Sequence, residues 1–220
     1  MKILNTEKED YHVHSMNYSD GLSTIDEIAR FAGEIGMKKI VICDHSQALI
    51  DKDQLAKKTF RSIALRWKNV FNDVDISFGV EADVLNEKGD ICSNIGGEEG
   101  SFLILSYHDY LFKGNKKKAA DAFIKAIERY HDKINIIGHV VLGLTEQEAE
   151  RVIKVANKYK IPCELNCKYF FKYPDAWGVL FRTADKVYVN SDAHTLYEIK
   201  ELRKQAWNRL KEMRIVATLL

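Results

Sequence analysis

The chain has 220 residues, of which 46% are hydrophobic and 30% charged, and its 33 basic residues are balanced by 32 acidic ones. This composition is typical of a globular protein with a substantial core, and it excludes a disordered chain. The formal net charge of +1 favours neither nucleic acid nor an anionic membrane as a partner, and no apolar run approaches the ~18 residues that span a bilayer. We expect a single domain over residues 1–220, located in the cytoplasm and without a signal peptide.

The four cysteines form no Cys-x-x-Cys pair along the sequence. They are Cys43, Cys92, Cys163 and Cys167. This spacing favours reduced structural thiols, with disulfides or a zinc knuckle as the alternative.

The first part of the sequence alternates between strand and helix patterns. Residues 11–15 predict a short strand, and Thr24 with Glu27 predicts a capping box that begins a helix ending near Gly36. The continuous apolar run at 39–43 is typical of a buried parallel strand. Strand, helix and strand therefore follow one another.

The same alternation continues to the C-terminus. The predicted elements are a helix over about 54–71, a strand over 76–80 that ends in Glu81, a strand over 102–105, a helix over 119–127, a strand over 134–139, a helix over 145–156, a strand over 161–166, a loose aromatic-rich segment over 169–181, a strand over 187–190 and a helix over 199–213. About seven strands alternating with helices favour an α/β fold with a closed, distorted (β/α)7 TIM-like barrel, and an open doubly wound sheet is the alternative. No Gly-x-Gly-x-x-Gly turn follows the first strand, which disfavours a dinucleotide fold.

Polar side chains stand at the ends of nearly all these strands. They are His12, His14, His45, Glu81, His108, His139, Asn166, Asp192 and His194. Because the carboxyl ends of barrel strands meet at one face, six of the seven histidines are expected to converge there, and His131 at a helix end is the exception. Clustered imidazoles and carboxylates need a shared partner to offset their desolvation, and divalent zinc, manganese or iron suits this mixture.

The ordered motifs HVH…SDG, CDHS, GVE, SYHD, GH and SDAH resemble the PHP (polymerase and histidinol phosphatase) superfamily of metal-dependent phosphoesterases. The resemblance spans about residues 10–200 and implies a distorted (β/α)7 barrel with two or three divalent ions at its mouth. It implies three ligand sets, namely His12, His14, Glu81 and Asp192; Glu81, His108 and His139; and Asp20, His45 and His194.

Two adjacent ions lower the pKa of a bridging water and neutralise charge on a transferring phosphoryl group. We therefore predict hydrolysis of a small, histidinol-phosphate-like phosphomonoester by a metal-bridging hydroxide, with Glu81, Asp192 and His194 as catalytic residues. Lys168 and Arg182 are the predicted substrate contacts, because the loop after the 161–166 strand opens at the same mouth. Aromatic residues of that loop provide faces that could stack on an imidazole or a nucleobase.

Three other functions are the alternatives. A nucleotide or oligonucleotide phosphoesterase or exonuclease requires a basic groove, and the one local basic run, at 113–118, is more simply a solvated helix start, so nucleic acid is not favoured. An amide or lactone hydrolase would be expected to place a carbamylated lysine at a strand end, where none is found. A non-catalytic regulatory barrel would not need to keep every costly polar group at its mouth.

Overall fold

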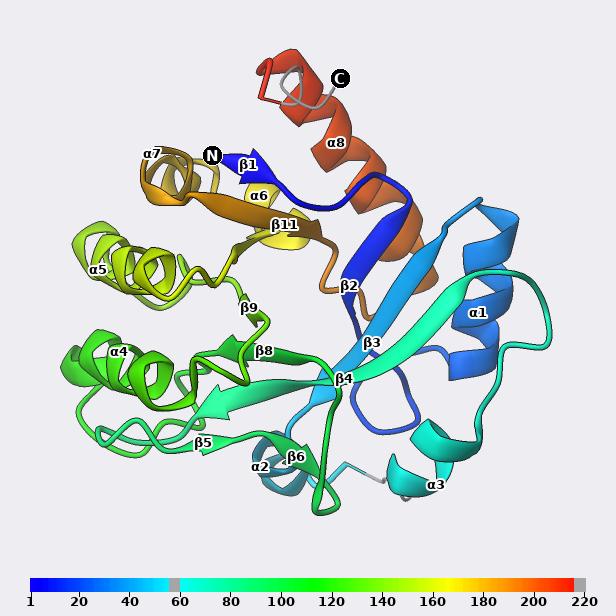
Figure 1. Cartoon of the computed structure of the whole chain (residues 1–220), viewed down its shortest axis with the longest axis horizontal. Helices are drawn as coiled ribbons and strands as arrows, with labels where there is room; N and C mark the ends of the chain where they lie inside the picture. The colour runs from blue at the N-terminus through cyan, green and yellow to red at the C-terminus, as the bar shows by residue number, and fades with distance from the viewer. Residues whose placement is uncertain (56–59, 216–220) are drawn as a thin grey trace.

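The computed structural model describes residues 1–55 and 60–215, and a parallel sheet forms its centre (Figure 1). Its strands are β1 (Lys2–Ile3), β2 (Glu9–Val13), β3 (Lys39–His45), β4 (Asp75–Val84), β8 (Leu103–Ser106), β9 (Ile136–Ile137), β10 (Cys163–Asn166) and β11 (Lys186–Asn190). From β2 to β11 they pair in chain order, and each pair is parallel. β5 (Ile91–Cys92) adds to β4 in the antiparallel sense, and β6 (Asn94–Ile95) pairs with β7 (Glu98–Glu99).

Helices lie around the outside of these strands, with α4, α5 and α7 on one side and α1 and α8 on the other (Figure 1). The helices are α1 (Ile25–Glu34), α2 (Gln47–Lys52), α3 (Phe60–Arg66), α4 (Ala119–Tyr130), α5 (Glu146–Lys158), α6 (Cys167–Lys172), α7 (Gly178–Thr183) and α8 (Arg203–Glu212), with the shorter turns η1 (Lys116–Lys118), η2 (Pro174–Trp177) and η3 (Glu198–Leu202). Within the described residues, no helix is both long and apolar enough to cross a lipid bilayer.

The seam between β11 and β2 closes the barrel irregularly. At the mouth, Val13 bridges Ala193, and the His14 backbone N–H donates to the Ala193 carbonyl at 2.8 Å. At the opposite end, β1 pairs with β11. Between these points the Asn5 side chain pairs with the edge of β11 as a neighbouring backbone would. Its Nδ2 donates to the Val189 carbonyl and its Oδ1 accepts from the Val189 N–H, both at 2.9 Å. The prediction of a distorted barrel is confirmed: its seven strands are β2, β3, β4, β8, β9, β10 and β11, and the two-residue β1 adds an eighth strand beside β11.

A small cluster of apolar side chains fills the barrel interior below the histidines. Val41, Cys43, Ile104 and Ile136 are fully buried and pack with Tyr11 of β2, Tyr188 of β11 and Phe102, which precedes β8. Since side chains alternate faces along a strand, His45 on β3 points to the same interior as Val41 and Cys43, one layer higher. All four cysteines are free thiols, as predicted.

Both predicted capping boxes are present at helix starts. The Thr24 hydroxyl accepts from the Glu27 N–H at 3.2 Å, while the Glu27 carboxylate accepts from the Thr24 N–H at 2.7 Å. Thr145 and Glu148 repeat this exchange at the start of α5. The predictions of α1 and α5 are therefore confirmed together with their first residues.

The predicted helix over 54–71 is wrong in its extent. Gln54 has a φ of +54°, the described helix α3 covers only Phe60–Arg66, and residues 56–59 lie outside the described part of the chain. After Trp67 the chain forms a loop in which Asn69 donates to the Val74 carbonyl and Asn72 to that of Ala29, at 2.9 and 2.8 Å. Asparagine side chains that bond the backbone compete with helix formation.

Two further elements differ from the sequence predictions. The segment over 169–181 is not loose, because α6, η2 and α7 cover most of it, and Pro174 and Gly178 stand where the helical pieces change. β4 runs past its predicted end to Val84, so Glu81 lies within the strand and pairs in register with His45. This longer strand brings a second carboxylate, Asp83, to the same face.

A buried arginine of α8 joins the seam to the mouth. Arg203 is 3% exposed, and its Nη1 and Nη2 donate to the carbonyls of Glu7 and Glu9 at 3.0 and 2.5 Å. Its Nε lies 3.2 Å from the Asp10 carboxylate, which also accepts the Ser191 hydroxyl at 2.6 Å. One ion pair therefore connects α8, the start of β2 and the turn after β11.

Arg203→Met is expected to lower the free energy of unfolding by about 3–5 kcal/mol, because Asp10 would stay buried without its cation. Urea unfolding measures this loss. The control is Arg209→Met, which removes the exposed pair with Glu212 and should cost about 1 kcal/mol or less. Equal losses for the two variants would show that Arg203 does not brace the seam.

Candidate metal centre

The structure brings six histidines together at the carboxyl ends of the strands. They are His12, His14, His45, His108, His139 and His194, and neighbouring rings in the cluster have centroids 4.3 to 6.3 Å apart. The Nε2 atoms of His12 and His14 lie 3.1 Å apart, so both rings aim at one point, as their two-residue spacing predicts. His131 instead stacks on the Tyr159 ring.

The buried Glu81 carboxylate is the centre of this cluster. Nitrogen atoms of five imidazoles face it. Their distances to Oε1 are 2.9 Å for His139, 3.6 Å for His12 and 3.8 Å for His108, and to Oε2 they are 2.8 Å for His45 and 3.6 Å for His14. Burial alone would raise the pKa of Glu81, but the imidazoles, His12 foremost, lower it well below its usual range. The carboxylate is therefore ionised at neutral pH.

Three groups of side chains present ligand atoms within 4.8 Å of one another. They are His12, His14 and Glu81; His45, Glu81 and His108; and His14, Asp20, His45 and His194. Two more carboxylate or imidazole contacts adjoin these groups, because Asp192 Oδ1 lies 3.1 Å from His14 Nε2 and His139 Nε2 lies 2.9 Å from Glu81. The groups contain seven of the nine predicted ligands and share them more widely than predicted, since His14, His45 and Glu81 each belong to two groups.

The residues present fit divalent ions. His45 Nδ1 and Glu81 Oε2 are buried and have no aligned hydrogen-bond partner among the described residues, although they lie only 2.8 Å apart. Orphaned buried polar atoms are costly, and a metal ion among them would satisfy both. Burial, together with the charges of His45 and His194, lowers the pKa of His14 well below its usual range, so the neutral, metal-binding form dominates.

Asp192 is held in an unusual backbone conformation beside these rings. Its φ is +53°, a value that residues other than glycine rarely adopt. Burial would raise its pKa, but the His12 and His14 imidazoles lower it well below its usual range. Strain of this kind persists where the surroundings fix it, and it often marks functional sites.

Glu164 is a supporting residue that the sequence analysis did not assign. Its fully buried carboxylate accepts from His12 Nδ1 at 2.8 Å, the His139 backbone N–H at 3.0 Å, and the side-chain amides of Asn166 and Asn190 at 3.2 and 3.1 Å. The first bond fixes the tautomer of His12, so that Nε2 faces the cluster.

Asp83 plays the same part for His108. It accepts from His108 Nδ1 at 2.6 Å and from the Ser46 hydroxyl, so the Nε2 atom of His108 is directed toward Glu81. The signal for Asp83 is present in the sequence, because it stands two residues after Glu81 on one strand and must share its face.

The predicted substrate contacts differ in their placement. Lys168 is partly buried in α6, beside Tyr169, whose ring centroid lies 6.0 Å from that of His139. Arg182 is exposed on α7 and pairs with Glu146 of α5. No described contact connects Arg182 to the histidine cluster, so only Lys168 stands beside the mouth.

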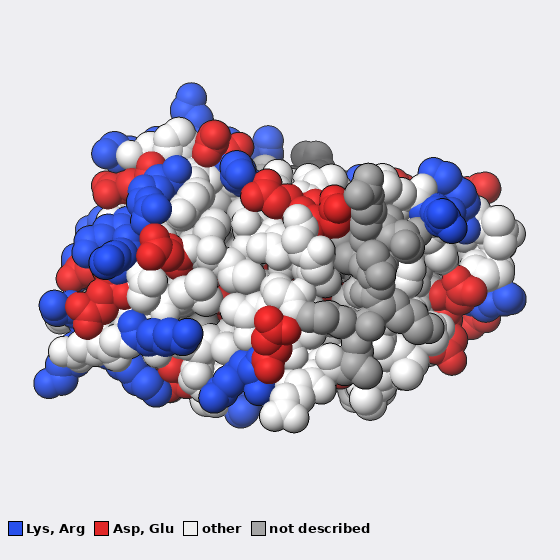
Figure 2. All heavy atoms as spheres, turned by 90° about the horizontal axis from the view of Figure 1, so that it is seen from below, with Lys and Arg blue, Asp and Glu red and all other residues white. Residues whose placement is uncertain are grey.

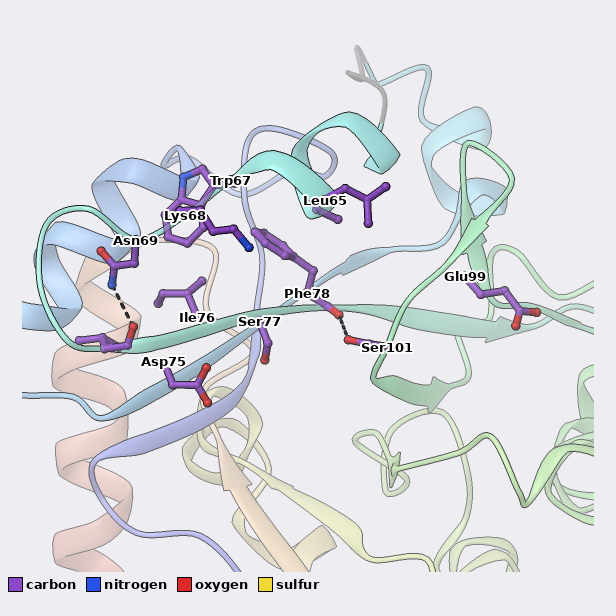
Figure 3. Close-up of a pocket in the computed structure, with 12 residues that line it drawn as sticks. Leu65, Trp67, Lys68, Asn69, Asp75, Ile76, Ser77, Phe78, Glu99 and Ser101 are labelled. Atoms are coloured by element: carbon purple, nitrogen blue, oxygen red, sulfur yellow. Dashed lines mark hydrogen bonds between the residues drawn. The ribbon is translucent and has the colours of Figure 1, made fainter.

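A hollow of about 510 Å³ lies elsewhere, between α3 and the first half of β4 (Figure 3). The rings of Trp67 and Phe78 meet edge to face in it, with centroids 5.9 Å apart, and Leu65 and Ile76 add apolar surface. None of the described ligand groups lies in its lining. The hollow and the histidine cluster are therefore separate features of the described structure.

Comparison with known proteins agrees with this geometry. Residues 10–170 match the PHP domain, a span that covers most of the chain. The chain belongs to the PHP domain family. It is 25% identical over 206 residues to the probable phosphatase YcdX of Shigella flexneri, covering 89% of this chain and 82% of that protein, and the Escherichia coli YcdX matches equally well.

A solved structure shows the same fold. The crystal structure of histidinol phosphate phosphatase from Lactococcus lactis, complexed with zinc, L-histidinol and phosphate, superposes with a TM-score of 0.50. The match covers 91% of this chain and 94% of that one at 14% identity. The resemblance to PHP proteins and the predicted barrel are thereby confirmed.

Proposed function

We propose that this chain is a metal-dependent phosphoesterase that hydrolyses a small phosphomonoester. The observation that carries the proposal is the ionised, buried Glu81 carboxylate facing five imidazoles, with orphaned polar atoms between them. Membership of the PHP family supports it, as do the relative described as a probable phosphatase and the related barrel that holds zinc and phosphate.

The proposed ligands of two or three zinc, manganese or iron ions are the nine residues His12, His14, Asp20, His45, Glu81, His108, His139, Asp192 and His194. When bound, adjacent divalent ions supply a nucleophile at neutral pH and offset the charge that builds on a phosphoryl group. Imidazole and carboxylate donors in this mixture suit these metals better than calcium or magnesium.

The chain's own residues have distinct proposed roles. Glu81 lies between two ligand groups and holds them together, and Asp192 holds its carboxylate against His14. His194 is more open to solvent than His12 or His14, and its Nε2 lies 3.1 Å from Asp20, so these two residues would hold an ion on the open side of the cluster, where it would offset charge on the leaving oxygen. Lys168 provides a cation for the phosphate.

No side-chain nucleophile is needed for this chemistry. The hydroxyls of Ser46 and Ser191 donate to the buried carboxylates of Asp83 and Asp10. These serines therefore position carboxylates rather than attack a substrate.

Turnover of p-nitrophenyl phosphate and bis-p-nitrophenyl phosphate tests the proposal. We expect the monoester to be hydrolysed faster, and a chelator to abolish turnover until manganese or zinc is restored. Preference for the diester would contradict the monoester assignment and favour a nucleotide or oligonucleotide substrate.

Chelation is also expected to lower the melting temperature. An ion that binds only the folded chain stabilises it by about 3–4 kcal/mol when present at 100 to 1,000 times its dissociation constant. Calorimetric melting before and after dialysis against a chelator measures the shift. The control is Glu81→Gln, which should show almost no shift on chelation; an equally large shift in that variant would place the metal elsewhere.

A further inference from the structure

Several exposed apolar side chains stand on segments that leave the strand ends where the histidine cluster lies. Six large apolar residues with more than 40% exposure follow β2, β8, β10 or β11, whereas Leu65 and Val70 lie between β3 and β4. The six are Met16, Leu22, Tyr110, Phe171, Tyr173 and Tyr197.

Tyr110 is fixed in position next to one of the proposed ligands. It lies at the tip of a tight turn, because the backbone N–H groups of Leu111 and Phe112 both donate to the His108 carbonyl, at 3.0 and 3.3 Å. Leu111 and Phe112 are buried, whereas Tyr110 is 50% exposed, and its ring centroid lies 6.0 Å from that of His108. The ring therefore stands at the edge of the cluster and remains open to a ligand.

Tyr169 occupies the matching position beside His139. The two rings meet edge to face with centroids 6.0 Å apart. Its backbone N–H donates to Asn166 Oδ1 at 3.2 Å, and the amide of Asn166 donates in turn to Asp192 at 3.0 Å. The Tyr173 ring stacks on the Tyr169 ring, and the bonds through Asn166 tie the position of Tyr169 to the cluster.

The two tyrosines flank the same part of the cluster. His108 and His139 have ring centroids 5.2 Å apart, and both direct Nε2 at Glu81 Oε1. We propose that Tyr110 and Tyr169 are specificity-determining residues that select phosphomonoesters with an apolar, aromatic leaving group. This inference rests on the proposed function, and it names the substrate class of the same site.

The charges nearby are consistent with a neutral leaving group. Asp109, beside Tyr110, is paired with Lys116 at 2.5 Å, so the charge of this loop is balanced. On the face seen from below, Lys and Arg are interspersed with Asp and Glu on the side where α4 lies, and the described residues in this view form no continuous basic stripe (Figure 2).

The test compares benzyl phosphate with glycerol 3-phosphate, whose leaving alcohols have similar basicity. We expect kcat/KM to be at least about tenfold higher for benzyl phosphate, the size of effect that aromatic contacts produce. Tyr110→Ala and Tyr169→Ala should each reduce this ratio severalfold, mainly through KM for the benzyl ester. Tyr110→Phe and Tyr169→Phe should keep the ratio, because the ring and not the hydroxyl makes the contact.

Tyr159→Ala is the matched control, since that ring stacks on His131 away from the cluster, and its ratio should equal that of the unmodified protein. A ratio near one in the unmodified protein, or an unchanged ratio in both alanine variants, would overturn the inference while leaving the phosphatase proposal intact. If no ester is hydrolysed, the proposed function fails instead. Calorimetry then measures the affinities of the metal-loaded protein for benzylphosphonate and for 2,3-dihydroxypropylphosphonate. Tighter binding of benzylphosphonate would support the inference, and equal affinities would overturn it.

Discussion

Replacing Glu81 with glutamine is expected to remove bound metal and activity together. The amide cannot carry the negative charge that faces five imidazoles, and it presents an N–H₂ group to atoms that need an acceptor or a metal. We expect metal content to fall below one ion per chain and kcat/KM for a monoester to fall by at least about 1,000-fold. Elemental analysis and phosphate release on the same preparation measure both effects.

Glu150→Gln is the control for this experiment. Glu150 is an exposed residue of α5 that pairs with Lys154, so its loss changes the net charge equally without touching the cluster. It should keep full metal content and full turnover. Normal metal content in Glu81→Gln would sink the central position given to Glu81, even if activity were lost.

Glu164→Gln is expected to be almost as harmful as Glu164→Ala. The carboxylate accepts from four donors, and a glutamine would turn its own N–H₂ toward some of them. Because His12 and the His139 backbone both depend on this carboxylate, we expect about 10- to 100-fold weaker metal binding. Competition against a chromophoric chelator measures the affinity of each variant.

The comparison variant is Glu212→Gln, which removes an exposed partner of Arg209 and should leave metal affinity unchanged. If Glu164→Gln bound metal as tightly as this control, the Glu164 carboxylate would fill space in the barrel interior and would not orient the metal ligands. A melting curve for each variant separates loss of the fold from loss of ligand geometry.

The fold and the histidine cluster were accessible from the sequence for a simple reason. His45 is the last residue of the apolar strand β3, His194 lies in the turn that follows β11, and the ends of parallel strands share one face. Spacing also places His12 and His14 on one side of β2, and their Nε2 atoms do meet.

The supporting residues were harder to find because their roles depend on distant partners. Glu164 lies in the short strand β10, and nothing local shows that four donors from three other segments and its own strand converge on it. The position of Arg182 also depends on a distant partner. It pairs with Glu146 because of the way α5 and α7 pack, and no local pattern indicates this contact. The asparagines that end the helical pattern after Trp67 act through long-range backbone bonds, which periodicity cannot reveal.

The most direct measurement is phosphate release from a monoester while chelator-stripped protein is titrated with manganese or zinc. A metal centre built around Glu81 predicts no turnover in the stripped protein and a rise that reaches its plateau at two or three equivalents per chain. Turnover that persists undiminished after stripping, or that never appears at any number of equivalents, would contradict a metal-dependent phosphoesterase.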